Sequence, residues 1–328
     1  MRTNTLGTLT TSAVGLGCMG MSGAYGESDR AESIATVHAA LDAGITLLDT
    51  GDFYGMGHNE LLLAEALRSI SRDTYQLSVK FGAQIGPDGS WVGYDARPAA
   101  VKTAAAYSLQ RLGTDYIDIY RPARLDPAVP IEDTVGAIGE LVDAGYVRHI
   151  GLSEVGSDTI RRAAAVRPVS DLQIEYSLMS RGVEHDILDT CRELGIGVTA
   201  YGVLSRGLIG GHWTKTSGAQ GDFRSATPRF SGDNLDRNLA LVEKLRGVAD
   251  ELGVSVAQAA IAWVASRGTD IVPLVGARTR RRLAEALGAV DVALTDDQLA
   301  PIEAAVPVEQ VAGDRYPAAH MAALDSEH

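Results

Sequence analysis

Two residues that can hold or transfer a proton follow an apolar segment near the N-terminus, in the sequence LLDTGDFYG (residues 47–55). Asp49 ends the apolar segment, Tyr54 lies five residues further on, and Lys80 ends the next such segment, YQLSVK. A tyrosine has a free pKa of about 10, so it is a poor acid or base at neutral pH. A nearby ammonium favours the phenolate, and a carboxylate can hold that ammonium in place. The three residues therefore indicate a tuned acid, in which Tyr54 transfers the proton, Lys80 lowers its pKa and Asp49 orients Lys80.

A simpler arrangement also accounts for these residue types. Asp49 and Lys80 can form an ordinary buried salt bridge, with Tyr54 as an unrelated neighbour. If the two apolar segments are neighbouring parallel strands, they lie roughly 4.8 Å apart, which would bring all three side chains within contact distance. The spacing alone does not decide between the two interpretations.

The elements that must position these residues follow a recurring order. A short β-rich segment is followed by a polar turn and an alanine-rich amphipathic segment, and several of the latter end in glycine, as a left-handed helix C-cap requires. Helices are expected, for example, at residues 30–44, 96–113 and 131–145. Strands are expected at residues 13–17, 45–50, 75–80, 116–123, 149–153, 171–177, 197–203 and 270–276.

Alternating strands and helices favour a parallel sheet covered by helices. Eight such units predict a closed (β/α)8 barrel that forms one domain over residues 1–328, preceded by an N-terminal hairpin. Residues 204–234 form a long Gly- and Ser-rich loop after the seventh strand, and residues 307–328 form a C-terminal tail. Loops of this length usually bind a ligand or cover a site. In such barrels the active site lies at the C-terminal ends of the strands, where Asp49 and Lys80 are expected.

Composition excludes several classes of partner. The net charge of −13 argues against nucleic acid, because binding phosphates needs a basic surface. No apolar run is long enough to cross a membrane, and the N-terminal residues lack the pattern of an export signal. Only two cysteines are present, which is typical of a reducing compartment. We therefore expect a cytoplasmic protein with a small-molecule ligand and no metal site.

Several motifs resemble those of one enzyme superfamily. LLDTGDFYGMGHNELL, with VK at the end of the next strand, resembles the aldo-keto reductases, which are nicotinamide-dependent barrels. GLGCMGMSGAYG, GYVRHIGLSE, AYGVLSRGL and PRFSGDN are similar to further motifs of that superfamily, in the same order and over almost the whole chain. The resemblance implies that Asp49, Tyr54 and Lys80 occupy three of the four catalytic positions. It also implies that Tyr54 protonates a carbonyl oxygen as a hydride reaches the carbon.

The fourth catalytic position departs from the superfamily. Members commonly carry histidine at the end of the fourth strand, whereas IYRPARLDP places Ala123 there. Loss of such a hydrogen-bond donor typically lowers the rate by about 10² to 10³. Side-chain alternation puts Arg121 on the same face as Ala123, one layer deeper in the barrel. Our hypothesis is that Arg121 or an ordered water partly replaces the histidine at the substrate; a structural ion pair is the alternative role for Arg121.

The cofactor prediction starts from four arginines in VGARTRRRLAEALG, at the start of a predicted helix. Cations are unfavourable at a helix N-terminus unless they meet a bound anion, although the arginines of an exposed helix can simply be solvated. The resemblance implies that the anion is the 2′-phosphate of NADPH. By the same resemblance, the cofactor-binding residues are Ser153, Gln173, Tyr201, Leu204, Arg206, Gly276, Arg278, Arg282 and Glu285. Three nearby residues depart from the usual pattern, namely Val203, Glu154 and Ala286.

The leading prediction is an NADPH-dependent reductase of an aldehyde or ketone, and two alternatives stay open. The missing histidine also fits an NADP(H)-binding sensor or partner subunit with little turnover, and the same chemistry could run mainly as a dehydrogenase. Tyr25, Trp91 and the residues around Trp213 are expected to line the substrate pocket, although Trp91 could equally anchor its loop. The RPAR sequence is similar to that of pyridoxal-reductase-like members. The substrate, the favoured direction and the existence of a homo-oligomer stay open.

Overall fold

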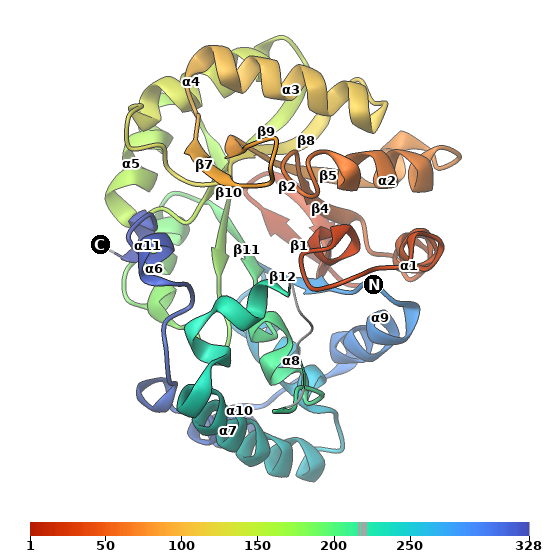
Figure 1. The fold of residues 1–328 in the computed structure, drawn as a ribbon, viewed down its shortest axis with the longest axis vertical. Coiled ribbons are helices and arrows are strands. Elements are labelled where there is room, and N and C mark those ends of the chain that lie inside the picture. The colour runs from red at the N-terminus through yellow and green to blue at the C-terminus, as the bar shows by residue number, and fades with distance from the viewer. Residues whose placement is uncertain (216, 218–221, 328) are drawn as a thin grey trace.

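The chain forms a closed barrel of eight parallel strands surrounded by helices in the computed structural model (Figure 1). The structure describes residues 1–215, 217 and 222–327. Each barrel strand pairs with the next one along the chain, and the last pairs with the first. The predicted (β/α)8 barrel is therefore confirmed. Its strands are β3 (Gly15–Gly17), β4 (Leu47–Gly51), β5 (Gln76–Phe81), β8 (Ile117–Pro122), β9 (Val147–Ser153), β10 (Val169–Glu175), β11 (Gly197–Tyr201) and β12 (Ile271–Gly276).

The helices form the outer layer and bury their apolar sides against the strands (Figure 1). Local sequence sets their ends. Asp29 caps the first helix by accepting a hydrogen bond from the Glu32 backbone, and Gly113 ends the third with a φ of 65°. The helices are α1 (Arg30–Asp42), α2 (His58–Leu67), α3 (Pro98–Leu112), α4 (Ile131–Asp143), α5 (Ser157–Val166), α6 (Ile187–Glu193), α7 (Gly232–Glu251), α8 (Val256–Ala265), α9 (Arg280–Leu287), α10 (Asp296–Ala305) and α11 (Ala318–Met321).

The bottom of the barrel is closed by the N-terminal hairpin of β1 (Thr3–Leu6) and β2 (Leu9–Ser12). Leu6 is fully buried there in an apolar cluster with Leu47, Ile119, Val272 and Leu274. A Cβ at position 197 would lie 2.5 Å from the Leu6 Cα, so only glycine lets the hairpin approach strand β11 this closely. The predicted N-terminal hairpin thus serves as the floor of the barrel, opposite the end that carries the polar residues.

Three excursions lie at the other end. A hairpin of β6 (Ala83–Ile85) and β7 (Trp91–Tyr94) follows β5, where a loop was expected around Trp91. The two strands are too short to show a clear alternation of apolar and polar residues in the sequence. The long segment after β11 contains three 3-10 turns, at Ser205–Gly210, Phe223–Ala226 and Pro228–Phe230, and its residues 216 and 218–221 lie outside the described part. The C-terminal tail folds back and contacts the ends of β9 and β10.

Within the described residues, no single helix is long and apolar enough to cross a membrane. Helices α7 and α8 would be long and apolar enough only together, and the chain bends by 85° between them. Most of the apolar residues of α8, such as Ile261 and Trp263, lie in the hydrophobic core.

The floor of the barrel yields a stability prediction. Leu6→Ala should lower the free energy of unfolding by about 2–5 kcal/mol, because it leaves a cavity among four buried side chains. Leu61→Ala on α2 is the control; its side chain is 51% exposed, so the change should be within about 0.5 kcal/mol. Urea unfolding of both variants measures the difference. Equal losses in the two variants would show that the hairpin does not support the barrel.

Candidate active site

A cavity of about 860 Å3 opens at the C-terminal ends of the barrel strands. Asp49, Tyr54 and Lys80 line its inner end, and residues of β12 and α9 line its outer end. The long segment after β11 and the C-terminal tail provide further walls, through Trp213 and Tyr316 among others. The structure therefore brings the predicted chemical residues and most of the predicted cofactor positions into one cavity.

The centre of the site is a buried ion pair between neighbouring strands. The Lys80 Nζ donates to Asp49 Oδ1 at 2.5 Å, and both side chains are about 5% exposed. Asp49 also accepts hydrogen bonds from Ser78 Oγ at 2.8 Å and from Gln173 Nε2 at 2.7 Å. Strand register brings Asp49 opposite Ser78 and places Lys80 two residues further along β5. The carboxylate is thus held from three sides, and it fixes the ammonium in turn.

Tyr54 lies against this ion pair, with Lys80 Nζ 5.0 Å from the centre of its ring. Burial raises the pKa of the Tyr54 phenol well above its ordinary value, the Asp49 charge adds to the rise, and Arg124 acts in the opposite direction. This direction is opposite to the sequence-based expectation that Lys80 would make the phenol unusually acidic. The reason is that burial of the phenol, and then the Asp49 charge, outweigh the cations around it. The phenol therefore keeps its proton and can serve as a donor.

Arg121 does point into the barrel one layer below, as predicted, but it does not line the cavity. Its Nη2 lies 2.6 Å from Asp171 Oδ2 and donates to Ser78 Oγ at 2.8 Å, and all three residues are fully buried. Arg121 therefore has no access to a substrate in this structure, and the ion-pair alternative describes its position. Its contact with Ser78 connects it indirectly to Asp49.

The predicted cofactor residues fall into two groups. Gln173, Tyr201, Leu204, Arg206, Gly276, Arg278, Arg282 and Glu285 line the cavity. Ser153 is not among the lining residues, but its Oγ lies 3.4 Å from Arg124 Nη1. The Arg206 guanidinium donates hydrogen bonds to the Glu175 carboxylate at 3.0 Å and to the Arg315 carbonyl at 2.8 Å. Arg206 therefore contacts the C-terminal tail as well as lining the cavity. Gly276 is exposed and a Cβ there would meet no atom within 4 Å, so this strand end opens onto free space.

The arginines at the start of α9 do not act as one cluster. Arg278 Nη1 donates to the carbonyl of Tyr25 at 2.8 Å, and Arg282 lies 3.0 Å from Glu285; both line the cavity. Arg280 instead pairs with Glu32 of α1, outside the cavity. The two guanidinium groups at this end have the donors that a phosphate requires. The residues present therefore fit the phosphate end of a dinucleotide.

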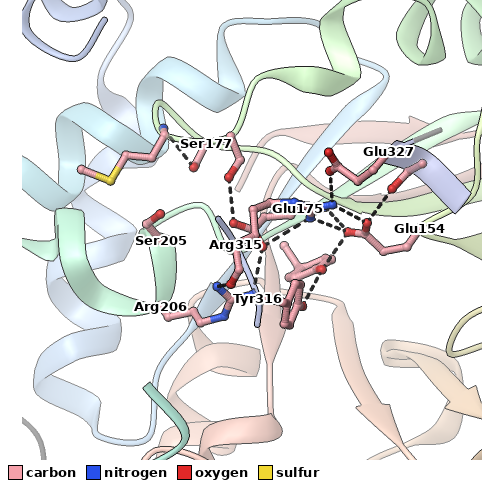
Figure 2. A network of polar contacts seen from close by, with 12 residues as sticks. Glu154, Glu175, Ser177, Ser205, Arg206, Arg315, Tyr316 and Glu327 are labelled. Atoms are coloured by element: carbon pink, nitrogen blue, oxygen red, sulfur yellow. Dashed lines mark hydrogen bonds and ion pairs between the residues drawn. The ribbon is translucent and has the colours of Figure 1, made fainter. Parts of the chain in front are cut away.

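Glu154 stands where the superfamily usually has asparagine, and in this structure it binds an arginine of the C-terminal tail. Its carboxylate accepts hydrogen bonds from Arg315 at 2.8 and 3.0 Å, and also from Ser326 and from Tyr201 (Figure 2). Burial acts to raise the pKa of this carboxyl, but Arg315 and its other donors hold the pKa below the ordinary value. Glu154 is thus an anchor for the C-terminal tail, and its oxygens are already occupied by protein donors.

Arg315 is the tail residue that makes this anchor. It is 6% exposed, and besides Glu154 it contacts Glu175 at 3.4 Å and Glu327 at 2.5 Å (Figure 2). The backbone of Gly156 also donates to Asp325 Oδ2 at 2.8 Å. These contacts dock the predicted C-terminal tail onto the strand ends.

The predicted substrate residues Tyr25 and Trp91 line the cavity. Burial raises the pKa of Tyr25 to about 12, while Trp91 is 45% exposed and contacts the Tyr94 ring edge-on at 4.8 Å. The sequence analysis did not identify three other lining residues, Arg124, Tyr316 and His320. Arg124 directly follows Ala123, which could have drawn attention to it, but no local pattern marks the two tail residues. His58, the exposed first residue of α2, lies outside the cavity, and its Nδ1 lies 2.9 Å from the Ser22 Oγ.

Comparisons with known proteins agree with the fold and with the family resemblance. The model of the Aldo/keto reductase family matches residues 13–307. The chain is 41% identical over 308 residues to "Probable aldo-keto reductase 1" of Glycine max, covering 93% of this chain and 88% of the soybean protein. The structure is similar to that of a glycerol dehydrogenase from Gluconobacter oxydans, with a TM-score of 0.84, 29% identity and 92% and 94% coverage. It is also similar to the holo form of an aldo-keto reductase from Bacillus halodurans, with a TM-score of 0.78, 25% identity and 94% and 97% coverage.

The chain therefore belongs to the aldo/keto reductase family. It is an oxidoreductase of a family that uses nicotinamide cofactors and acts on small carbonyl compounds.

The loop that carries Tyr54 also contains a titratable group with a stability effect. Asp52 Oδ1 is buried without a hydrogen-bond partner in the described part of the chain. Burial, and then the nearby Glu60, raise the pKa of Asp52 from 3.8 to about 7. The folded form therefore keeps a proton that the unfolded form loses above about pH 4. The contribution of Asp52 to the free energy of unfolding should therefore fall as the pH rises from about 4 to 7, and it should stay constant above pH 7.

Asp52→Asn should remove this dependence, because an amide does not titrate. Between pH 5 and 7.5, the free energy of unfolding of the wild type should fall by about 2 kcal/mol relative to that of the variant. This figure follows from 1.36 kcal/mol per pKa unit, reduced because Asp52 is partly exposed. Urea unfolding at both pH values measures the loss, with Asp42→Asn at the exposed end of α1 as the control. Identical pH slopes for Asp52→Asn and the wild type would contradict the raised pKa.

Proposed function

We propose that this protein reduces an aldehyde or ketone to an alcohol with NADPH, and that Tyr54 donates the proton. The observation that most supports the proposal is the common cavity of Tyr54, Lys80 and Asp49 with the cofactor-binding positions. When bound, the cofactor would supply the hydride. The residues that would hold it are Ser153, Gln173 and Tyr201 at the nicotinamide end, and Arg278, Arg282 and Glu285 at the phosphate end.

In this proposal each of the three inner residues has one task. Tyr54 is a protonated phenol, because burial keeps its pKa high. Tyr54 gives its proton to the substrate oxygen as that oxygen gains negative charge. The growing charge makes the oxygen basic enough to accept a proton from a weak acid such as this phenol. Lys80 stabilises the phenolate that Tyr54 becomes, since its ammonium lies 5.0 Å from the ring centre. Asp49 keeps Lys80 in position through their 2.5 Å contact.

The oxidative direction is a second candidate, because the same groups run the reaction in reverse. The glycerol dehydrogenase at 29% identity, which covers 92% of this chain, favours it. In that direction Tyr54 would begin as the base, so its high pKa would limit the rate at neutral pH. The direction of the pKa shift therefore supports reduction over oxidation at neutral pH.

The proposal predicts a strong dependence on one hydroxyl. Tyr54→Phe should lower kcat for carbonyl reduction by about 10² to 10⁴, because it removes the only proton that the mechanism uses. Tyr107→Phe on α3 is the matched control, since Tyr107 is 57% exposed, and it should leave kcat unchanged. The assay follows NADPH absorbance with pyridoxal, simple aldehydes, quinones and keto sugars. Full activity of Tyr54→Phe would remove Tyr54 from the mechanism, and tight NADPH binding without turnover by the wild type would favour a sensor.

The choice of NADPH over NADH predicts a separate effect at α9. Arg282→Ala should raise the Kd for NADPH by about 10- to 100-fold, because a hydrogen bond to a charged group is worth about 1.5–3 kcal/mol. The Kd for NADH should not change, since NADH lacks the 2′-phosphate. Arg281→Ala is the control; Arg281 lies in the same helical turn but does not line the cavity. Fluorescence titration measures both constants, and equal losses of NADPH and NADH affinity would contradict a 2′-phosphate site.

A further inference from the structure

The site lacks the histidine of its family, and a different cation lies next to that position. Ala123 lines the cavity, and so does the half-buried Arg124 that follows it. Arg124 Nη1 donates to the carbonyl of Ala123 at 2.6 Å, which folds the guanidinium back over the alanine. Its remaining contacts are with the hydroxyls of Ser153 at 3.4 Å and Tyr316 at 3.2 Å.

The contacts of Arg124 leave its charge uncompensated. Among the described residues, no carboxylate lies within 4.0 Å of its guanidinium, whereas Arg121, Arg206 and Arg315 each pair with one. A guanidinium that lines a cavity without a paired carboxylate is suited to meet negative charge on a ligand.

Strand pairing places this cation near the proton donor. Strand β8, which Arg124 follows by two residues, pairs with β5, which carries Lys80 near its end. The Lys80 Nζ lies 5.0 Å from the centre of the Tyr54 ring, and all three residues line the cavity. The cation and the proton donor therefore lie at neighbouring strand ends of one cavity.

The C-terminal tail adds a hydroxyl to this cation. Tyr316 lines the cavity and directs its Oη at Arg124 Nη2 at 3.2 Å and at Tyr201 Oη at 2.9 Å. Its ring lies 4.3 Å from the Arg206 guanidinium carbon. The neighbouring Arg315 is locked onto Glu154 and Glu175 at the strand ends, so the tail has little freedom there (Figure 2). Because Tyr201 donates its hydroxyl proton to the Glu154 carboxylate, Tyr316 donates its own proton to Tyr201 and accepts from Arg124. Tyr316 is thus a rigidly held acceptor that fixes the Arg124 guanidinium, and it comes from a segment 192 residues away from Arg124.

We infer that the Arg124 guanidinium, fixed by the Tyr316 hydroxyl, holds the substrate carbonyl oxygen beside Tyr54 in place of the missing imidazole. This inference rests on the proposed carbonyl reduction. The guanidinium keeps its own bonds in the reaction: the C=O π bond breaks, the hydride that the nicotinamide would supply makes the new C–H bond, the new O–H proton comes from Tyr54, and Arg124 stabilises the charge that oxygen gains. A fixed cation beside a developing negative charge is effective at this, since removal of one such donor typically lowers kcat by about 10² to 10³.

The glutamate at position 154 then has an indirect part. It binds Arg315 and accepts a hydrogen bond from Tyr201 at 2.7 Å, so it holds both the tail and the tyrosine that Tyr316 contacts. Glu154 is a positioning residue for Tyr316 in this arrangement. The departures at positions 123 and 154 are therefore parts of one change, in which an arginine that a tail hydroxyl fixes takes the place of a strand-end histidine.

The test uses variants that keep side-chain size, measured with NADPH and the best carbonyl substrate of the wild type. Tyr316→Phe should lower kcat by about 10-fold or more, and Arg124→Gln by about 10² to 10³, while the Kd for NADPH stays within about twofold. Arg162→Gln, in an exposed pair with Glu132, is the control and should leave kcat unchanged. Adding Ala123→His to Arg124→Gln should restore kcat at least tenfold, which a purely structural role of Arg124 would not produce.

The outcomes separate this inference from the function on which it rests. If the wild type reduces carbonyls in a Tyr54-dependent way but Arg124→Gln and Tyr316→Phe keep full kcat, the role of Arg124 at the carbonyl oxygen is wrong and the proposed function stands. If both variants lose kcat only in proportion to their loss of NADPH affinity, the two residues serve the cofactor and the inference is also wrong. If the wild type shows no Tyr54-dependent reduction, the proposed function and the inference fall together.

Discussion

The buried ion pair of Asp49 and Lys80 is the interaction on which the rest of the site depends. Two charges taken out of water are tolerated only when every remaining hydrogen-bonding position is met, and loss of one partner typically costs about 3–5 kcal/mol. Asp49 meets this demand through Ser78 and Gln173, and Ser78 in turn contacts Arg121. The barrel therefore carries a polar layer beneath its catalytic end. Burial, and then the Asp49 charge, raise the pKa of the Tyr54 phenol, which explains why the phenol stays protonated.

The second constraint is the docking of the C-terminal tail. The superfamily pattern leaves the residue after Ser153 free to contact a cofactor, whereas Glu154 is occupied by Arg315, Ser326 and Tyr201. One substitution on a strand end thus changes what the tail can do, because a buried carboxylate needs a buried cation. The tail supplies that cation and, one residue later, a tyrosine in the cavity. The substrate end of the site is consequently built from both the barrel and the last residues of the chain.

Much of this fold could be predicted from the sequence, because strand alternation and glycine C-caps are local signals. All eight predicted strands overlap observed ones, and Asp49 and Lys80 were identified because they end two of them. The hypothesis that Arg121 contacts the substrate does not agree with this structure, in which Arg121 pairs with the buried Asp171 below the cavity. Side-chain alternation predicts the face of a strand on which a residue lies, but it does not predict which residue it contacts there. The direction of the Tyr54 pKa shift depends on burial, which spacing does not reveal. Tyr316 was missed because no local pattern links it to Arg124, 192 residues earlier in the chain.

The central claim is that Tyr54 is a protonated donor that faces a carbonyl oxygen over the Asp49–Lys80 pair. A crystal structure of the ternary complex with NADP+ and an unreactive carbonyl ligand tests this claim most directly. The account predicts that the ligand oxygen lies within hydrogen-bond distance of the Tyr54 Oη, with the nicotinamide ring against Tyr201 and the ion pair intact. A carbonyl oxygen bound elsewhere in the cavity, with Tyr54 turned away from both ligand and nicotinamide, would contradict it.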